Sequence, residues 1–170
     1  MNAARAALLE GSLAGLDLVA GRAGPVVDVG SGGGAPGIPL AHALPGTEFV
    51  LLEAERRKCA FLELHAPPNA RVVWGRAEDQ DVDWAGVAVA RALAKPPTAI
   101  EWCLPLVRPG GIVVLWVGPS AEPNAVARAA EKIAGRLAPS PPGFLVVEKT
   151  GPTPTGFPRR AGVAKKRPLA

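Results

Sequence analysis

A glycine-rich segment near the start of the chain has the composition of a ligand-binding loop. It runs from Asp28 to Gly37 with the sequence DVGSGGGAPG and includes the end of a short apolar stretch. Glycines at the carboxyl end of a strand let the backbone approach a ligand closely and adopt positive φ angles. Three of them match the GxGxxG spacing of dinucleotide-binding loops, which is weak evidence alone: Gly32, Gly34 and Gly37. Asp28 and Pro36 favour a methionine-nucleoside ligand over a pyrophosphate, and a purely structural turn is the alternative.

A second candidate is the acidic residue that ends the next apolar stretch. Glu53 lies 25 residues after Asp28. A carboxylate there can accept hydrogen bonds from both ribose hydroxyls of an adenosine, in NAD and in S-adenosylmethionine alike. The alternative is that Glu53 stabilises the start of the following helix through the helix dipole, a part that Glu55 could also take.

Two further segments follow predicted strands and carry polar groups. Gly75–Asp79 reads GRAED, and the backbone of Ala77 and Glu78 is placed to contact a nucleobase. Arg91 follows the next strand and is expected to point into the same cleft, close to a transferred group. An acidic surface turn and an exposed loop arginine are the respective alternatives.

The rest of the chain predicts the elements that bring these segments together. Apolar stretches predict strands at 26–29, 48–52, 71–74, 87–90, 112–117 and 144–148. Helical periodicity predicts helices at 3–19, with a break at Gly11 or Gly15, and at 37–43, 55–65, 97–106 and 121–137. This alternation predicts one α/β domain over residues 1–170, a mostly parallel sheet with helices on both faces. Ligands bind such sheets at the carboxyl ends of the strands, where the four segments lie.

The excess of positive charge is confined to the end of the chain. The 170 residues carry a formal net charge of +4, yet the last 22 hold six basic residues and no acidic one. These residues are Lys149, Arg159, Arg160, Lys165, Lys166 and Arg167. A basic tail over 151–170 on a mildly acidic body predicts contact with a polyanion, most simply a phosphate backbone. A solvated, frayed terminus is the alternative.

The composition excludes several classes of protein. With 48% apolar and 20% charged residues, the chain is globular rather than disordered. No apolar run approaches the roughly 20 residues of a membrane helix, and the first residues do not resemble a secretory signal. Cys59 and Cys103 lie in no metal-ligand or redox spacing. We therefore expect a reduced, cytoplasmic monomer with no membrane contact and no metal site.

With these segments placed, the chain resembles the RsmG (GidB) family, bacterial methyltransferases that modify a guanine N7 in 16S ribosomal RNA. The matching stretches are DVGSGGGAPGIPLA (28–41), LLEAERRKCAFL (51–62), GRAED (75–79) and ARALAKPPTAIEWCLPLVRPGG (90–111). The tail FPRRAGVAKKRPL (157–169) also looks like the end of many members. The proline-glycine pair in the loop and the PRRAG tail are fairly specific to this family, whereas the other stretches are general to class I methyltransferases.

The resemblance implies a Rossmann-like class I methyltransferase fold, S-adenosylmethionine as cofactor and the small ribosomal subunit as partner. The implied cofactor contacts, with the loop glycine of the GxGxxG match, are Gly30, Gly32, Ala35, Glu53, Ala77, Glu78 and Arg91. The implied phosphate contacts of the tail are Arg159, Arg160, Lys165, Lys166 and Arg167. Guanine N7 carries no proton, so no general base is required and no catalytic residue is assigned. We expect removal of residues from Phe157 onward to weaken RNA binding and leave cofactor binding intact.

The chain departs from the family pattern in three places. The family has a longer helical region before the segment that Leu9–Leu13 matches. In this chain only a short helical stub is present at the N-terminus (1–24). Val117 stands where the family often has a lysine, and the small Ala35 stands where a bulky apolar residue is frequent. These departures leave substrate engagement and activity open.

Large apolar side chains are expected to form the core rather than to stack on RNA bases. Three tryptophans in or beside apolar elements are assigned to the core: Trp74, Trp102 and Trp116. Trp84 lies among aspartates and is less easily assigned. Helix 55–65 has an apolar side opposite its charges: Ala60, Phe61 and Leu64.

Three other functions fit part of the pattern. A small-molecule methyltransferase would have the same domain, but the basic tail argues against it. A nicotinamide-dependent oxidoreductase fits the GxGxxG spacing, but no separate substrate domain follows. A non-catalytic RNA-binding member of the family would explain the departures, and cofactor binding distinguishes it from the enzymes.

Overall fold

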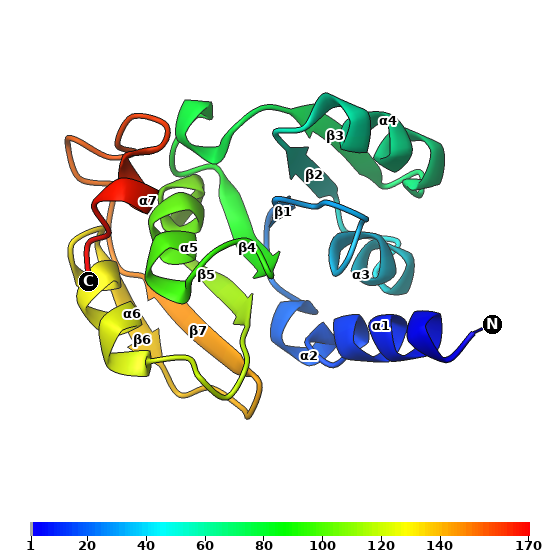
Figure 1. Ribbon diagram of the computed structural model, residues 1–170, viewed down its shortest axis with the longest axis horizontal. Helices are drawn as coiled ribbons and strands as arrows, with labels where there is room; N and C mark the ends of the chain where they lie inside the picture. Colours follow the sequence, from blue (N-terminus) through cyan, green and yellow to red (C-terminus); the bar gives the residue numbers. More distant parts are fainter. Residues whose placement is uncertain (1) are drawn as a thin grey trace.

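The computed structural model describes residues 2–170 and contains one seven-stranded sheet. Its strands are β1 (Val26–Val29), β2 (Phe49–Glu53), β3 (Ala70–Trp74), β4 (Ala85–Arg91), β5 (Val107–Trp116), β6 (Gly135–Ala138) and β7 (Phe144–Lys149). They lie in the order β3-β2-β1-β4-β5-β7-β6 (Figure 1). The first five are parallel, and β7 is antiparallel to both of its neighbours. The strand order reverses between β1 and β4, which is where open α/β sheets bind ligands.

Helices cover both faces of this sheet, as predicted. They are α1 (Ala3–Leu13), α2 (Leu16–Val19), α3 (Gly37–Ala43), α4 (Arg56–His65), α5 (Pro96–Cys103), α6 (Pro123–Glu131) and α7 (Val163–Lys166), with 3-10 turns η1 (Ala77–Asp79) and η2 (Leu104–Leu106). Side chains of α5, α6 and α7 form one core with the sheet, while α2 and α3 contribute to a second. Figure 1 shows the N-terminal helices and the C-terminal segment on opposite sides of the molecule.

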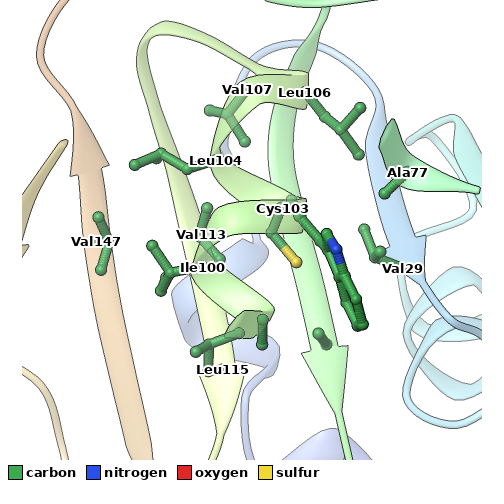
Figure 2. Close-up of a cluster of buried hydrophobic side chains, with 14 of the residues drawn as sticks. Val29, Ala77, Ile100, Cys103, Leu104, Leu106, Val107, Val113, Leu115 and Val147 are labelled. Atoms are coloured by element: carbon green, nitrogen blue, oxygen red, sulfur yellow. The ribbon is translucent and has the colours of Figure 1, made fainter. Parts of the chain in front are cut away.

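Burial on both faces explains why the central strands are almost entirely apolar, with Asp28 in β1 and Glu53 at the end of β2 as exceptions. Both faces of β1 and β2 are covered, and every residue of these strands is buried. Parallel strands that are buried on both faces need continuous apolar runs rather than alternation. In Figure 2, Ile100 and Cys103 of α5 lie against Val113 and Leu115 of β5. None of the helices in residues 2–170 has the length and apolar character needed to cross a bilayer.

The helix predicted over 121–137 is wrong in its second half. Helix α6 ends at Glu131, and the chain then turns into strand β6, which pairs with β7. Ala134 has a φ of 55°, and a Cβ on Gly135 would lie 2.4 Å from Leu104 Cδ2. A β-strand edge left without a partner exposes backbone N–H and C=O groups, so pairing overrides the helical propensity of this segment. In the helix predicted over 3–19, the break is confirmed at Gly15, which precedes α2.

The expected packing of the β3 side of the sheet is also wrong. Trp74 is 59% exposed and Leu64 82% exposed, and Phe61 is exposed as well. Helix α4 instead buries Cys59 and Leu62. Strand β3 is the last strand on this side, so α4 covers it with a narrow apolar stripe and leaves the other apolar side chains in solvent. Trp102 is buried, and Trp84 and Trp116 pack against the two cores.

Candidate active site

A cleft of about 510 Å³ opens at the carboxyl ends of the central strands. Small-molecule sites commonly have volumes of roughly 300–1,000 Å³. All seven predicted cofactor residues line it: Gly30, Gly32, Ala35, Glu53, Ala77, Glu78 and Arg91. They come from four separate segments, which the sheet brings together at the point where its strand order reverses.

The conformation of the glycine loop is incompatible with side chains at two of its glycines. Gly30 has a φ of 70°, and a Cβ built on it would lie 2.4 Å from Leu93 Cδ1. Gly34 has a φ of 92°, and its Cβ would lie 2.5 Å from Ile38 Cδ1. Residues other than glycine rarely adopt such angles, so the loop backbone forms the wall of the cleft. The N–H of Gly30 donates to the Leu52 carbonyl at 2.8 Å and joins this wall to β2.

Asp28 stabilises the glycine loop through a hydrogen bond and does not line the cleft. Its Oδ2 accepts a hydrogen bond from the Gly37 N–H at 3.0 Å, and the side chain is buried. A Cβ on Gly37 would lie 2.5 Å from that oxygen, so the close approach requires glycine there. Burial, with a smaller contribution from the nearby Glu53 carboxylate, raises the pKa of Asp28 to about 7, although hydrogen bonds with Ser31 and the Gly37 N–H oppose the rise.

The raised pKa of Asp28 predicts a pH-dependent stability. Its unfolded pKa is near 3.8 and its folded pKa about 7, so between these values the native state binds more protons and stability falls as pH rises. Above pH 7 the loss is complete. We expect the free energy of unfolding of Asp28→Asn, relative to that of the wild type, to increase by roughly 3 kcal/mol as the pH rises from about 5 to about 8. Urea unfolding of both proteins at the two pH values measures this, and a constant difference would contradict it.

Glu53 fixes a carboxylate at the end of β2. Its Oε2 accepts from the Gly32 N–H and its Oε1 from the Glu55 N–H, each at 2.8 Å. The side chain is 7% exposed, and it also lines the cleft. Each carboxylate oxygen is able to accept more than one hydrogen bond, so Glu53 retains the capacity to accept hydrogen bonds from two ribose hydroxyls. Glu53 therefore supports the backbone entering α4 as well as facing the ligand space.

Turn η1 forms a third wall of the cleft. Two buried side-chain atoms that belong to residues lining the cleft lack hydrogen-bond partners. The Glu78 Oε1 and the Trp102 Nε1 are buried and have no hydrogen-bond partner among residues 2–170. Both residues line the cleft. A buried polar atom without a partner costs about 1–3 kcal/mol, so such atoms call for an explanation. A nucleobase carries both donors and acceptors, and the residues present fit the nucleoside part of S-adenosylmethionine.

Arg91 joins the cleft to the N-terminal helix. Its Nη1 donates to the Leu8 carbonyl and to Ser12 Oγ, each at 3.4 Å. The Trp116 Nε1 donates to the Gly11 carbonyl at 2.7 Å and holds the same helix from β5. The guanidinium is thus shared between the cleft and α1, whereas the sequence placed it in the cleft alone.

The basic tail is docked on the protein rather than frayed. Both oxygens of Glu101, a side chain that is 2% exposed, accept hydrogen bonds from the Arg159 guanidinium. The Arg159 Nη2 also donates to the Arg167 carbonyl at 2.8 Å. Ala164 of α7 is buried against the core, and Lys132 Nζ donates to the Leu169 carbonyl at 2.7 Å. Arg159 is therefore engaged within the chain and unsuited to the phosphate contact expected of it.

The tail also forms part of the cleft, which the sequence did not indicate. Lys165 Nζ lies 5.5 Å from the centroid of the Trp102 ring, and both residues line the cleft. Because Lys165 lines the cleft, we instead expect removal of residues from Phe157 onward to weaken cofactor binding. Arg160, Lys166 and Arg167 are exposed and remain available to a polyanion.

A buried lysine anchors the start of the tail. The Lys149 Nζ donates to Asp83 Oδ1 at 3.0 Å, to Thr153 Oγ1 at 2.7 Å and to the Leu104 carbonyl at 2.9 Å. Burial lowers the pKa of Lys149, while the Asp83 carboxylate opposes that effect. Although it belongs to the basic tail by sequence, Lys149 is enclosed and has a structural role.

A second cavity, of about 540 Å³, adjoins the first and shares Ala92 with it. It lies beyond the ends of β4 and β5, and its lining includes Trp116, Val117 and two exposed basic residues, Lys95 and Arg128. Val117, the residue at the family lysine position, faces this cavity. No local sequence pattern indicates this cavity, because Lys95 and Arg128 come from segments far apart in the chain.

Comparison with known sequences identifies the family. The family model GidB, rRNA small subunit methyltransferase G, matches residues 6–139. The ribosomal RNA small subunit methyltransferase G of Symbiobacterium thermophilum is 38% identical over 85% of this chain and 69% of its own length. The protein of the same name from Synechococcus sp. is 39% identical over 84% of this chain and 63% of its own length. The chain thus spans about two thirds of the length of these relatives.

Solved structures agree on the fold. The antibiotic-resistance methyltransferase Kmr has a TM-score of 0.60 at 19% identity, over 84% of this chain and 91% of its own. A TehB-like SAM-dependent methyltransferase from Corynebacterium glutamicum has a TM-score of 0.64 at 19% identity, over 82% and 88%. The TYW2 protein of M. jannaschii, solved with AdoMet, has a TM-score of 0.61 at 16% identity, over 81% and 73%. By its fold and its sequence, this chain belongs to the GidB family of rRNA small subunit methyltransferase G proteins.

Proposed function

We propose that this chain transfers the methyl group of S-adenosylmethionine to N7 of a guanine in 16S ribosomal RNA. One observation carries the proposal: the four segments that carry the family resemblance line a single cleft of nucleoside size. The family relationship supplies the substrate class, because the relatives are named as small-subunit ribosomal RNA methyltransferases.

The cleft offers a partner for each part of the cofactor. Glu53 accepts the ribose hydroxyls, since its carboxylate is held in place by two backbone N–H groups. Glu78 and the η1 backbone contact the adenine, where Glu78 Oε1 lacks a partner within residues 2–170. The amino-acid part lies along Gly30 and the rest of the glycine loop, which has no side chain to obstruct it.

Alignment rather than acid-base chemistry is the main task of the protein groups. S-adenosylmethionine supplies a methyl group on a sulfonium, which is already a good leaving group. Guanine N7 is an acceptor without a proton, so no residue needs to act as a base. Holding the two reactants in line can supply about 7–11 kcal/mol of barrier lowering. Arg91 is a positioning residue, because it connects the cleft to α1.

The second cavity is the site we propose for the target guanine. It shares Ala92 with the cofactor cleft, so a base held there lies next to the transferred methyl group. Lys95 and Arg128 would contact the phosphates of the inserted nucleotide. Exposed Arg160, Lys166 and Arg167 of the tail would contact the flanking backbone.

Calorimetric titration with S-adenosylmethionine, and with NAD as the control, tests the cofactor assignment. We expect micromolar affinity for S-adenosylmethionine and no measurable affinity for NAD. Binding of NAD alone would overturn the methyltransferase assignment of the cleft. Binding of neither would favour a non-catalytic member of the family.

A further inference from the structure

A basic and aromatic surface lies on the side of the cleft away from the tail. We call it the α4 surface, and it consists of Arg56, Arg57, Phe61 and Trp74. All four residues are exposed, with Trp74 at 59% and Phe61 at 46%. Exposed aromatic rings beside cations are typical of surfaces that bind a ligand with both an apolar plane and negative charge.

Helix stability does not account for the cations of the α4 surface. Arg56 and Arg57 occupy the first positions of α4, and its first turn holds no acidic residue. The amino end of a helix carries partial positive charge, so cations there are unfavourable. Neither arginine takes part in any ion pair within residues 2–170. Their charge is therefore available to an external anion.

Trp74 is held in place while most of its ring remains in solvent. Its Nε1 donates to the Ala54 carbonyl at 3.0 Å, and the Arg56 guanidinium carbon lies 4.9 Å from the ring centroid. An indole with its N–H already satisfied offers a preformed apolar plane at little cost in conformational freedom. Bases of single-stranded RNA stack on aromatic rings and on arginine planes of this kind.

Arg57 and Phe61 of the α4 surface line a groove that adjoins the cofactor cleft, and Arg56 with Trp74 lies outside that groove. This groove, of about 410 Å³, is lined by Arg57, Phe61, Gly32, Gly33, Glu55 and Lys58. Gly32, Gly33 and Lys58 also line the cofactor cleft. The carboxylate in this groove, Glu55, pairs with Lys58 at 2.8 Å, so the pair adds no net negative charge. The groove thus extends from the rim of the cofactor cleft along a wall that carries Arg57 and Phe61.

We infer that the α4 surface binds single-stranded RNA that flanks the target guanine. Bases stack on Trp74 and Phe61, and phosphates contact Arg56 and Arg57. This inference rests on the proposed function and adds to it a second contact, on the far side of the cleft from Arg160, Lys166 and Arg167. The charge of the surface and its aromatic planes together favour RNA over a protein partner.

The test compares variants of the α4 surface in the full chain. Trp74→Ala, Trp74→Phe and the double variant Arg56→Ala/Arg57→Ala are matched with Arg22→Ala/Arg136→Ala. That control removes two exposed arginines outside the α4 surface, one before the central strand β1 and one in the edge strand β6. None of the five positions lines the cofactor cleft, so affinity for S-adenosylmethionine should stay within about twofold and verify folding.

Binding of protein-free 16S rRNA, of a short labelled single-stranded RNA and of assembled 30S subunits is measured over a range of salt concentrations, and methylation of 16S rRNA is assayed in parallel. We expect Trp74→Ala to weaken binding about fivefold or more, and Trp74→Phe to retain most of it. The arginine double variant should reduce the slope of log K against log salt by roughly 1.4, about 0.7 for each lost phosphate contact. The control variant should keep the wild-type slope.

Three outcomes would overturn the inference. Wild-type RNA affinity in Trp74→Ala and in the arginine double variant, with methylation intact, would show that RNA does not bind to the α4 surface. A loss seen on assembled 30S subunits but not on protein-free RNA would assign the surface to a protein contact. If the wild-type chain neither binds nor methylates 16S rRNA, the proposed function itself fails, which the wild-type assay distinguishes from failure of the α4 variants alone.

Discussion

Replacing Gly30 with aspartate should lower the affinity for S-adenosylmethionine by at least about 100-fold. Three effects act together. A φ of 70° strains any residue with a Cβ, and that Cβ would lie 2.4 Å from Leu93 Cδ1. The new carboxylate would also occupy the ligand space, near the Glu53 carboxylate that also lines the cleft.

Gly46→Ala is the control, because it changes a glycine outside the cofactor cleft without these effects. A Cβ on Gly46 meets no atom within 4 Å, and its φ is not positive. Calorimetric titration of both variants, with thermal melting to verify folding, should show loss of binding in the first and near wild-type affinity in the second. Unchanged affinity in Gly30→Asp would remove the glycine loop from the cofactor site.

Replacing Arg159 with alanine should destabilise the protein by about 2–4 kcal/mol. The change leaves the Glu101 carboxylate, 2% exposed, without its partner in a position from which it cannot reach water. The figure is below that of a fully buried pair, because the Arg159 side chain is 24% exposed. The tail should loosen with it, so affinity for S-adenosylmethionine should also fall, since Lys165 lines the cleft.

Urea unfolding of two further variants separates this effect from a general loss of charge. Arg136→Ala breaks an ion pair of 2.6 Å whose side chains are 72% and 43% exposed, and it should cost less than about 1 kcal/mol. Glu101→Leu/Arg159→Met removes both charges and should recover most of the stability. Wild-type stability in Arg159→Ala would mean that the tail is not docked through this pair in solution.

The parts of the site that depend on local sequence could be predicted. A glycine loop that ends a strand and an acidic residue that ends the next strand can be recognised within a few residues. Their meeting point then follows from the topology of parallel sheets, which places all carboxyl strand ends at one edge. For this reason Gly30, Glu53 and Glu78 were found to line the same cleft.

The parts that depend on tertiary packing could not be predicted. The contact of Lys165 with Trp102 joins residues far apart in the chain, and nothing local to either signals it. The tail was read as a charged terminus, although Ala164 is buried and fixes its position. Trp74 was assigned to the core because it is large and apolar, yet its place at the end of an edge strand leaves it exposed.

The docked tail would connect cofactor binding with the proposed RNA binding. Arg159 is paired with Glu101 and Lys165 lines the cofactor cleft, while Arg160, Lys166 and Arg167 are exposed outside it. One short segment therefore closes a wall of the cofactor cleft and presents cations beside it. Sequence alone assigned all five residues to RNA, because net charge does not reveal which side chains a fold has already paired.

Methyl transfer to ribosomal RNA tests the central claim most directly. Radiolabelled S-adenosylmethionine is incubated with the full chain and with 30S subunits that lack the modification, and the 16S rRNA is then cleaved chemically at N7-methylguanine. We expect one labelled guanine in 16S rRNA, and no labelling when Gly30→Asp replaces the wild type. Tight binding of S-adenosylmethionine without methyl transfer to either 30S subunits or 16S rRNA would contradict it.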